Sequence, residues 1–306
     1  MSSLVLPAGV TVLERGWLSS NNVLLQGAHA NALVDSGYCS HADQTLALVA
    51  QTLGQQPLHE LVNTHLHSDH CGGNAAVQAA YPGLQTRIPP GQAEHVRHWN
   101  PEALSYTPTG QQCPAFKFQQ TICPGDEVTL GQQTWQVHAA PGHDPHAVML
   151  FEPQSRTLIS GDALWEKGFG VVFPELEGEQ AFDFVADSLT LIETLQPAVV
   201  IPGHGRPFGH VESALTTARR RLDDFRQAPQ RHALYAAKVL LKFKLLEAQS
   251  LPLTALWAWA GSTPYFNLLH QRYFADSNFA VWLDMLARDL ERSGAAARQN
   301  GALLNA

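Results

Sequence analysis

The sequence has few cysteines, and no two of them are closely spaced. Its 306 residues include only 4: Cys39, Cys71, Cys113 and Cys123. The absence of a Cys-x-x-Cys pair argues against a zinc ribbon, and so small a number excludes a dense disulfide scaffold. Reduced thiols are therefore expected, although pairing of Cys113 with Cys123 is left open.

Long apolar runs and an excess of positive charge are also missing. No stretch approaches the roughly 20 apolar residues of a membrane span, and residues 1–9 lack the basic start and apolar run of a secretion signal. The 27 acidic residues outnumber the 19 basic ones, which leaves a net charge of −8. A nucleic-acid binder usually needs a basic face. We therefore expect a cytoplasmic protein with no membrane contact, whose partner is a small molecule rather than a nucleic acid.

The hydrophobic content of 45% is that of a globular chain, long enough for a large domain and a smaller one. Alternation and turn residues predict a β-rich opening, then a strand–helix alternation, then a second β-rich half. The expected strands are 10–13, 22–25, 30–34, 58–63, 127–130, 134–139, 148–151, 157–160 and 198–201. The expected helices are 41–53, 73–80, 180–195 and 211–225. Residues 88–124 show no periodic pattern and predict a long loop, functional or mobile.

A change of composition near residue 228 predicts a domain boundary, with a first domain at 1–227 and a second at 228–306. The second is expected to be mostly helical, with helices at 233–248, 253–260, 264–274 and 279–292. A tight turn is expected at Gly261-Ser262, and Asn300-Gly301 is a hairpin signal. Helices followed by a hairpin resemble a winged helix. The last helix carries too little positive charge for DNA, so dimerisation, as a homodimer, or capping of a substrate is favoured.

Four metal-ligating side chains occur within the six residues 65–70. They are His65, His67, Asp69 and His70, and they follow the apolar pair Leu61-Val62. In an extended segment, residues i and i+2 point the same way, so His65 and His67 can bind one ion while Asp69 and His70 turn toward a second.

Three further residues that can bind metal follow predicted strands, each in a turn that contains glycine. They are His143 in Pro141-Gly142-His143, Asp162 in Ser160-Gly161-Asp162, and His204 in Pro202-Gly203-His204. In a chain with 15 histidines, a lone histidine is more often an ordinary surface or core residue. A set of seven ligand types at successive strand ends instead predicts a metal site.

This order of motifs resembles the metallo-β-lactamase superfamily over residues 10–226. The resemblance implies an α/β fold, a four-layer αββα sandwich with the site along one edge between the sheets. It also implies two metal ions. His65, His67 and His143 would bind the first, Asp69, His70 and His204 the second, and Asp162 would bridge both. The bridging Asp162 is typical of glyoxalase II-like, lactonase and RNase Z-like members rather than of true β-lactamases.

Two residues near the predicted ligands keep open roles. Asp35 follows a strand and precedes Ser36-Gly37, so it either caps a turn or supports a ligand without binding the metal. His146 lies three residues after His143, where many relatives have a histidine four residues on. A supporting or substrate contact is favoured for His146, with a plain histidine at the start of a strand of comparable weight.

The two-metal pattern predicts hydrolysis by a metal-bridging hydroxide, because two divalent ions lower the pKa of a shared water. Asp69 is expected to orient it. The nitrogen and oxygen ligands suit zinc, with iron or manganese as alternatives. The segment 163–173 follows Asp162, and its Trp165, Lys167 and Phe169 either line a pocket or form an ordinary surface loop.

Three functions follow from this pattern. The first is hydrolysis of a small ester, thioester or lactone, which the acidic charge and the aromatic loops favour. The second is a single-stranded RNA nuclease, which rests on Arg219-Arg220-Arg221 and the helical tail; because Asp223 and Asp224 follow at once, that run also fits a solvated helix face. The third is a non-catalytic metal-binding regulatory protein, and the complete ligand set makes it the weakest.

Overall fold

The computed structural model describes residues 4–306 and divides into two compact units. One contains the chain up to Leu104 together with Cys113–Asp223. The other contains Ser105–Gln112 and Asp224–Ala306. The division falls inside helix α8 (Val211–Gln227).

The first unit contains two β-sheets. One has six strands in chain order, β1 (Val10–Leu13), β2 (Asn22–Leu25), β3 (Ala32–Val34), β4 (Glu60–Val62), β5 (Gln85–Ile88) and β6 (Gln120–Thr121). The first three strands are antiparallel, and β3 to β6 are parallel. The other sheet has the order β11 (Val199–Pro202), β10 (Thr157–Gly161), β9 (Val148–Glu152), β8 (Gln133–Ala139) and β7 (Glu127–Leu130). The predicted strands are therefore present.

The two sheets stack, and their buried strands alternate between two cores. On β2, Val23 and Leu25 join the cluster between the sheets, whereas Leu24 joins a second cluster with residues of α1 (Ala42–Leu53) and α3 (Asn74–Ala80). Successive strand residues point to opposite faces, so a strand buried on both sides reads as a continuous apolar run. This packing explains why these strands carry so few polar residues.

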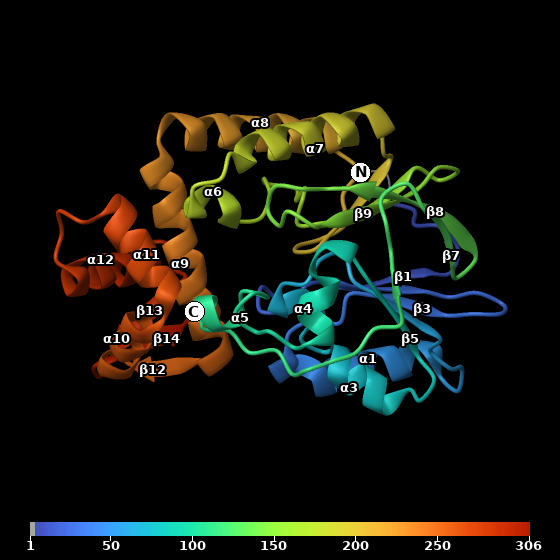
Figure 1. Ribbon diagram of the computed structural model, residues 1–306, viewed down its shortest axis with the longest axis horizontal. Helices are drawn as coiled ribbons and strands as arrows, with labels where there is room; N and C mark the ends of the chain where they lie inside the picture. The colour runs from blue at the N-terminus through green and yellow to red at the C-terminus, as the bar shows by residue number, and fades with distance from the viewer. Residues whose placement is uncertain (1–3) are drawn as a thin grey trace. The chain divides into compact units, whose positions relative to one another are not determined.

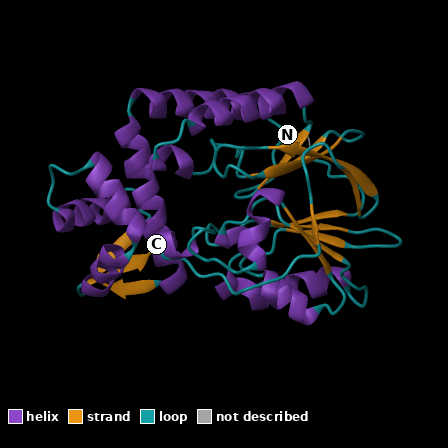
Figure 2. Cartoon of the chain, viewed as in Figure 1, coloured by secondary structure: helices purple, strands orange, loops and turns teal. Residues whose placement is uncertain are grey.

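Helices cover the outer faces of both sheets. Figure 1 shows α1 and α3 beyond the first sheet, with α7 (Ala181–Leu195) and α8 beyond the second, and Figure 2 shows the same order of helix, strand, strand and helix. The predicted four-layer αββα sandwich is confirmed. Shorter helices are η1 (Cys39–His41), α2 (Ser68–Cys71), η2 (Pro90–Gln92), α4 (Ala93–Arg97) and α6 (Phe173–Glu177).

The second unit is mostly helical, as predicted. It contains α9 (Pro229–Ala248), α10 (Leu253–Ser262), α11 (Pro264–Tyr273), α12 (Phe279–Arg292) and a sheet of β12 (Ser250–Pro252), β14 (Ala302–Asn305) and β13 (Ala296–Gln299). The predicted hairpin joins β13 to β14, and Asn300 and Gly301 take the positive φ values, 50° and 76°, that such a turn requires.

Two local predictions were wrong. The 88–124 region is not structureless, because it holds η2, α4, α5 (Tyr106–Thr109) and β6. Buried Tyr106 helps α5 pack against α11 within the second unit, a long-range contact that local pattern does not encode. Gly261 and Ser262 are helical, and the chain turns at Thr263, because Pro264 then begins α11 and disfavours helix in the residue before it.

Within residues 4–306, none of the helices has both the length and the apolar character needed to cross a bilayer.

Candidate metal centre

The predicted ligands meet at one edge of the first unit because of strand direction. Parallel strands β10 and β11 end together, just before Asp162 and His204. Strand β8 is antiparallel to β9, and β9 to β10, so β8 also ends at this edge and leads to His143. On the facing sheet, β3 and β4 are parallel and lead to Asp35 and His65.

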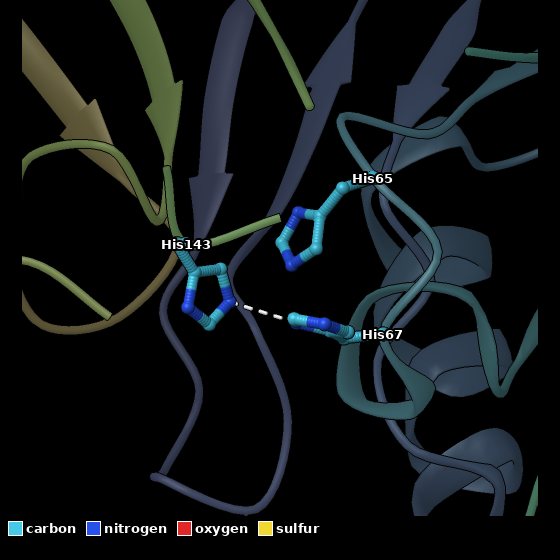
Figure 3. A group of neighbouring side chains, drawn as sticks. All are labelled: His65, His67 and His143. Atoms are coloured by element: carbon cyan, nitrogen blue, oxygen red, sulfur yellow. Dashed lines mark hydrogen bonds between the residues drawn. The ribbon is translucent and has the colours of Figure 1, made fainter. Parts of the chain in front are cut away.

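The first group of ligand atoms contains His65, His67 and His143, whose atoms lie within 4.8 Å of one another. Figure 3 shows the three rings converging, His65 and His67 from the segment after β4 and His143 from the opposite side. Nδ1 of His67 lies 2.7 Å from Nε2 of His143. The geometry thus brings the two imidazoles of the 65–67 segment together with that of His143, which lies 76 positions beyond His67 in the chain.

The second group contains Asp69, His70 and His204, and a third, with His65, His70 and Asp162, overlaps both. Nε2 of His204 is 3.0 Å from Oδ2 of Asp69, and Nε2 of His70 is 3.4 Å from Oδ1 of Asp162. Oδ2 of Asp162 also lies 3.4 Å from Nε2 of His143. Nε2 of His204 is 3.9 Å from the same oxygen, so Asp162 faces histidines of both groups.

In two histidines, a hydrogen-bond acceptor beside the ring determines which ring nitrogen carries the proton. Nδ1 of His143 faces the Val171 carbonyl at 2.5 Å, and a carbonyl can only accept, so Nδ1 carries the proton. Nδ1 of His70 likewise donates to the Asp35 carboxylate at 2.8 Å. In both rings the proton on Nδ1 leaves Nε2 as the nitrogen that can bind a metal, as in metal-binding histidines.

The electrostatics of the centre fit a cation. Burial, with repulsion from neighbouring histidines, lowers the pKa of His65 well below its ordinary value and that of His143 to about 4. Burial also opposes charge on His70, but the carboxylates of Asp35, Asp162 and Asp69 outweigh it and hold that pKa well above 6.5. Two rings thus keep free lone pairs at neutral pH, in a field that attracts positive charge.

Three buried nitrogens in the histidines of the centre have no hydrogen-bond partner, Nε2 of His65, Nε2 of His70 and Nδ1 of His204, and the two Nε2 atoms are the ones available to a metal. A buried polar atom without a partner costs about 1–3 kcal/mol unless something satisfies it. A divalent ion would satisfy both. The residues present therefore fit the metals that the sequence predicts.

Glycine at position 203 allows the ligand turns to approach closely. A Cβ there would lie 2.2 Å from Oδ1 of Asp162 and 2.9 Å from Cε1 of His70. Any side chain would therefore displace a predicted ligand, which explains the glycine before His204.

Asp35 lies beneath the ligands. Its carboxylate accepts from the Thr64 backbone N–H at 2.9 Å and the Thr64 hydroxyl at 2.8 Å, as well as from His70. The residue is 3% exposed and has a left-handed φ of 59°. The structure thus places Asp35 against a predicted ligand.

The other residues that the sequence singled out lie at different distances from the centre. Trp165 is half-buried, and its Nε1 donates to Oδ1 of Asp162 at 3.1 Å. Phe169 is buried beneath the Arg221 guanidinium, and Lys167 is exposed. His146 is exposed, rests against Gly91 and belongs to none of the ligand groups found among the described residues.

Sequence reasoning missed the loop after β1. Trp17, 57% exposed, stacks on His204 at 5.3 Å between ring centroids and meets Trp165 edge-on at 5.4 Å. Nearby, Asn21 donates to the carbonyls of Pro202 and Gly205, which flank the His204 turn. No local pattern marks these residues, because the turn they contact is 181 positions or more away in the chain from Asn21.

Two more residues lie beside the first group: Phe173, at the end of the 163–173 segment whose aromatics were expected to line a pocket, and Asp144, which sequence reasoning missed. The Phe173 ring packs against His67 and His143. Oδ2 of the buried Asp144 lies 3.8 Å from Nε2 of His67. Asp144 directly follows His143, and that adjacency was the one signal available in the sequence.

Comparison with known proteins gives curated relatives that are hydrolases. The chain is 29% identical over 205 residues to a hydroxyacylglutathione hydrolase of Rhodospirillum rubrum, a match covering 65% of this chain and 68% of that one. It is 24% identical to an acyl-coenzyme A thioesterase of Gallus gallus, covering 65% and 78%. Other hydroxyacylglutathione hydrolases match over about half of their length, as in Brucella anthropi at 43% and Francisella tularensis at 54%.

Solved structures share the fold. A metallo-β-lactamase family protein from Thermus thermophilus matches with a TM-score of 0.58 and 22% identity, covering 99% of this chain and 100% of that one. TTHA1623, solved in a di-iron-bound form, matches with a TM-score of 0.51 and 26% identity, covering 68% and 98%. The family model of the metallo-β-lactamase superfamily matches residues 15–204. The chain therefore belongs to the metallo-β-lactamase superfamily of hydrolases, as its motif order predicted.

Proposed function

We propose that this protein is a hydrolase of small thioesters that works with two divalent metal ions. The observation that carries the proposal is the convergence of seven side chains into overlapping ligand groups at one edge of the sandwich. His65, His67 and His143 would hold the first ion, Asp69, His70 and His204 the second, and Asp162 would bridge them.

The donor set supports zinc, with iron or manganese as alternatives, because imidazole and carboxylate ligands suit all three. TTHA1623, which has a similar fold, holds two irons. When bound, such ions make water nucleophilic at neutral pH and polarise a carbonyl group.

The surrounding residues would position the ligands and the substrate. Asp35 holds the His70 ring in one tautomer, and Trp165 restrains the bridging carboxylate through its N–H. Asp69, whose pKa the neighbouring His70 and His204 lower against the effect of burial, stays ionised and can orient the attacking water. Asp69 would thus have two roles, as a ligand of the second ion and as the carboxylate that orients the water.

Aromatic side chains beside the centre favour a substrate with an apolar portion. Trp17 and Trp165 lie on the His204 side, and Phe173 packs against His67 and His143. The hydrolase of Rhodospirillum rubrum is named for hydroxyacylglutathione, and the thioesterase of Gallus gallus for acyl-coenzyme A. Together these observations favour a thioester over the ester and lactone that the ligand motif alone also allows.

The nuclease alternative has less support. Arg219 forms a paired contact with Glu193, with its nitrogens at 3.0 and 2.7 Å from the two carboxylate oxygens. Arg221 lies over Phe169 and donates to the Lys167 carbonyl. Two members of the basic run are therefore engaged within the protein rather than arranged as a surface for phosphates.

The test is turnover of purified, metal-loaded protein on acyl-thioesters, esters, lactones, β-lactams and single-stranded RNA. Thioesters should be hydrolysed fastest. His143→Ala should lower turnover by more than about 100-fold, since even changes to partners of metal ligands cost 10–100-fold. His146→Ala removes a nearby exposed histidine and should retain activity. Turnover of RNA alone, or equal activity in both variants, would count against the proposal.

A further inference from the structure

Two thiols lie in contact beside the ligand-bearing segment. Sγ of Cys71 is 3.9 Å from Sγ of Cys113, although 42 positions separate them in the chain. Both belong to the first compact unit, and all four cysteines are reduced thiols. Cys123, which the sequence left as a pairing partner for Cys113, instead has its sulfur 3.8 Å from the Thr121 hydroxyl.

Cys71 is tied to the segment that carries the predicted ligands. It is the last residue of α2, directly after His70, and is fully buried. Its S–H donates to the Leu66 carbonyl at 3.4 Å, and its backbone N–H donates to the His67 carbonyl at 3.1 Å. Leu66 stands between two predicted ligands, so a change at the Cys71 sulfur acts directly on the segment that holds them.

Cys113 differs from Cys71 in exposure. It is half-buried and lies in the connection between β5 and β6, so a small solute can reach it. Its sulfur lies against that of Cys71, so a reactive species formed on Cys113 would meet a second thiol at once. A disulfide needs the sulfurs about 2.05 Å apart, and side-chain rotation from van der Waals contact can supply much of that approach.

We propose that Cys71 and Cys113 form a dithiol modification site that hydroperoxides oxidise to a disulfide, which loosens the adjoining metal-binding segment. In the first step the Cys113 sulfur attacks the hydroperoxide, forming an S–O bond and breaking the O–O bond to give a sulfenic acid. The thiol proton passes to the departing oxygen, which leaves as water from hydrogen peroxide or as an alcohol from an organic hydroperoxide. The Cys71 sulfur then attacks the Cys113 sulfur, and the hydroxyl leaves with the Cys71 proton as water. The two thiols lose two electrons, and the peroxide gains them.

The disulfide would affect the ligands through two local changes. The Leu66 carbonyl would lose its S–H donor, because a disulfide sulfur carries no proton. The Cys71 sulfur would also move toward Cys113 and pull on the end of α2. We expect the metal ions to transfer to a chelator about tenfold faster, at the lower end of what changes around metal ligands cause. This consequence rests on the proposed metal centre, whereas disulfide formation does not.

The experiment treats the metal-loaded full chain with stepwise equivalents of hydrogen peroxide, blocks remaining thiols by alkylation, and maps non-reduced peptides by mass spectrometry. The expected result is a peptide pair linking Cys71 to Cys113, lighter by two hydrogens than the separate thiol peptides, and reversed by dithiothreitol. Cys113→Ser should abolish it, Cys113→Ala serves as a second variant if the serine disturbs folding, and Cys123→Ser should leave it unchanged.

Several results would overturn the proposal. These are linkage of Cys71 to Cys39, oxidation of Cys113 to sulfinic acid while Cys71 stays a thiol, or an unchanged rate of metal transfer in the cross-linked protein. The peptide map does not depend on catalysis, so a protein that forms the disulfide but hydrolyses no thioester would refute the proposed function and leave the modification site standing.

Discussion

Replacing Asp35 by Asn should weaken one metal site selectively. The carboxylate of Asp35 accepts from the Thr64 N–H, the Thr64 hydroxyl and Nδ1 of His70. An Asn can keep its oxygen at the Thr64 backbone N–H only by turning its NH₂ toward Nδ1 of His70, where a donor would face a donor. The His70 ring would then favour the opposite tautomer, with its proton on the nitrogen that should bind metal. Asn also tolerates the left-handed φ of 59°, so backbone strain does not add to the effect.

The expected loss of metal affinity follows from the hydrogen bond between Asp35 and His70 that the substitution removes. A buried hydrogen bond to a charged group contributes about 1.5–3 kcal/mol, which corresponds to about 10–150-fold in affinity. Only the ion bound by His70 should weaken by this amount. Chelator competition on metal-loaded protein should therefore release one equivalent at a lower chelator concentration than the other.

The matched control is Asp43→Asn, which removes the same charge from an exposed position in the first turn of α1. It should bind both equivalents as the parent protein does. If Asp35→Asn also retained both affinities while folding normally, the argument that Asp35 sets the His70 tautomer would be refuted.

Two other perturbations test the surroundings of the centre. Trp17→Ala should raise KM for thioesters with apolar acyl groups by up to about tenfold, because an aromatic contact contributes about 0.5–1.5 kcal/mol. It should leave the metal count unchanged. A change in KM that did not depend on the length of the acyl group would contradict this. Metal-free protein should lose at least about 3 kcal/mol of unfolding free energy as pH falls from 6.5 to 4, since the unfolded chain takes up a proton on His143 near pH 6.5 and the folded chain only at a pKa of about 4. The lowered pKa of His65 adds to this loss. The raised pKa of His70 does not offset this loss, because below pH 6.5 that ring is protonated in both states; urea titrations at pH 4, 5 and 6.5 measure the slope, and a flat profile would contradict it.

Strand ends were the most predictable feature of this molecule. Apolar runs such as Val199–Pro202 are buried on both sides, so they could be predicted as strands. The metal-ligating residues directly after them could be predicted to form a site because strands β10 and β11 end at the same edge. The seven predicted ligand residues accordingly lie in the three groups that the structure brings together. Their roles in binding metal stay a prediction.

Long-range packing was not predictable. Trp17 and Asn21 contact the His204 turn from a loop whose sequence has no periodic signal. Buried Tyr106 packs the short helix α5 within the second unit, although the surrounding segment shows no local sequence pattern. The contact of Cys71 with Cys113 is likewise invisible in their spacing. In each case contacts with residues distant in the chain determine where the side chain lies, and a local sequence pattern carries little information about such contacts.

Whether seven side chains hold two metal ions can be measured by counting zinc, iron and manganese per chain with plasma mass spectrometry, in the parent protein and in His143→Ala and His204→Ala. We predict two equivalents in the parent and a loss of at least one in each variant. A single equivalent in the parent, or two that survive both substitutions, would contradict the account.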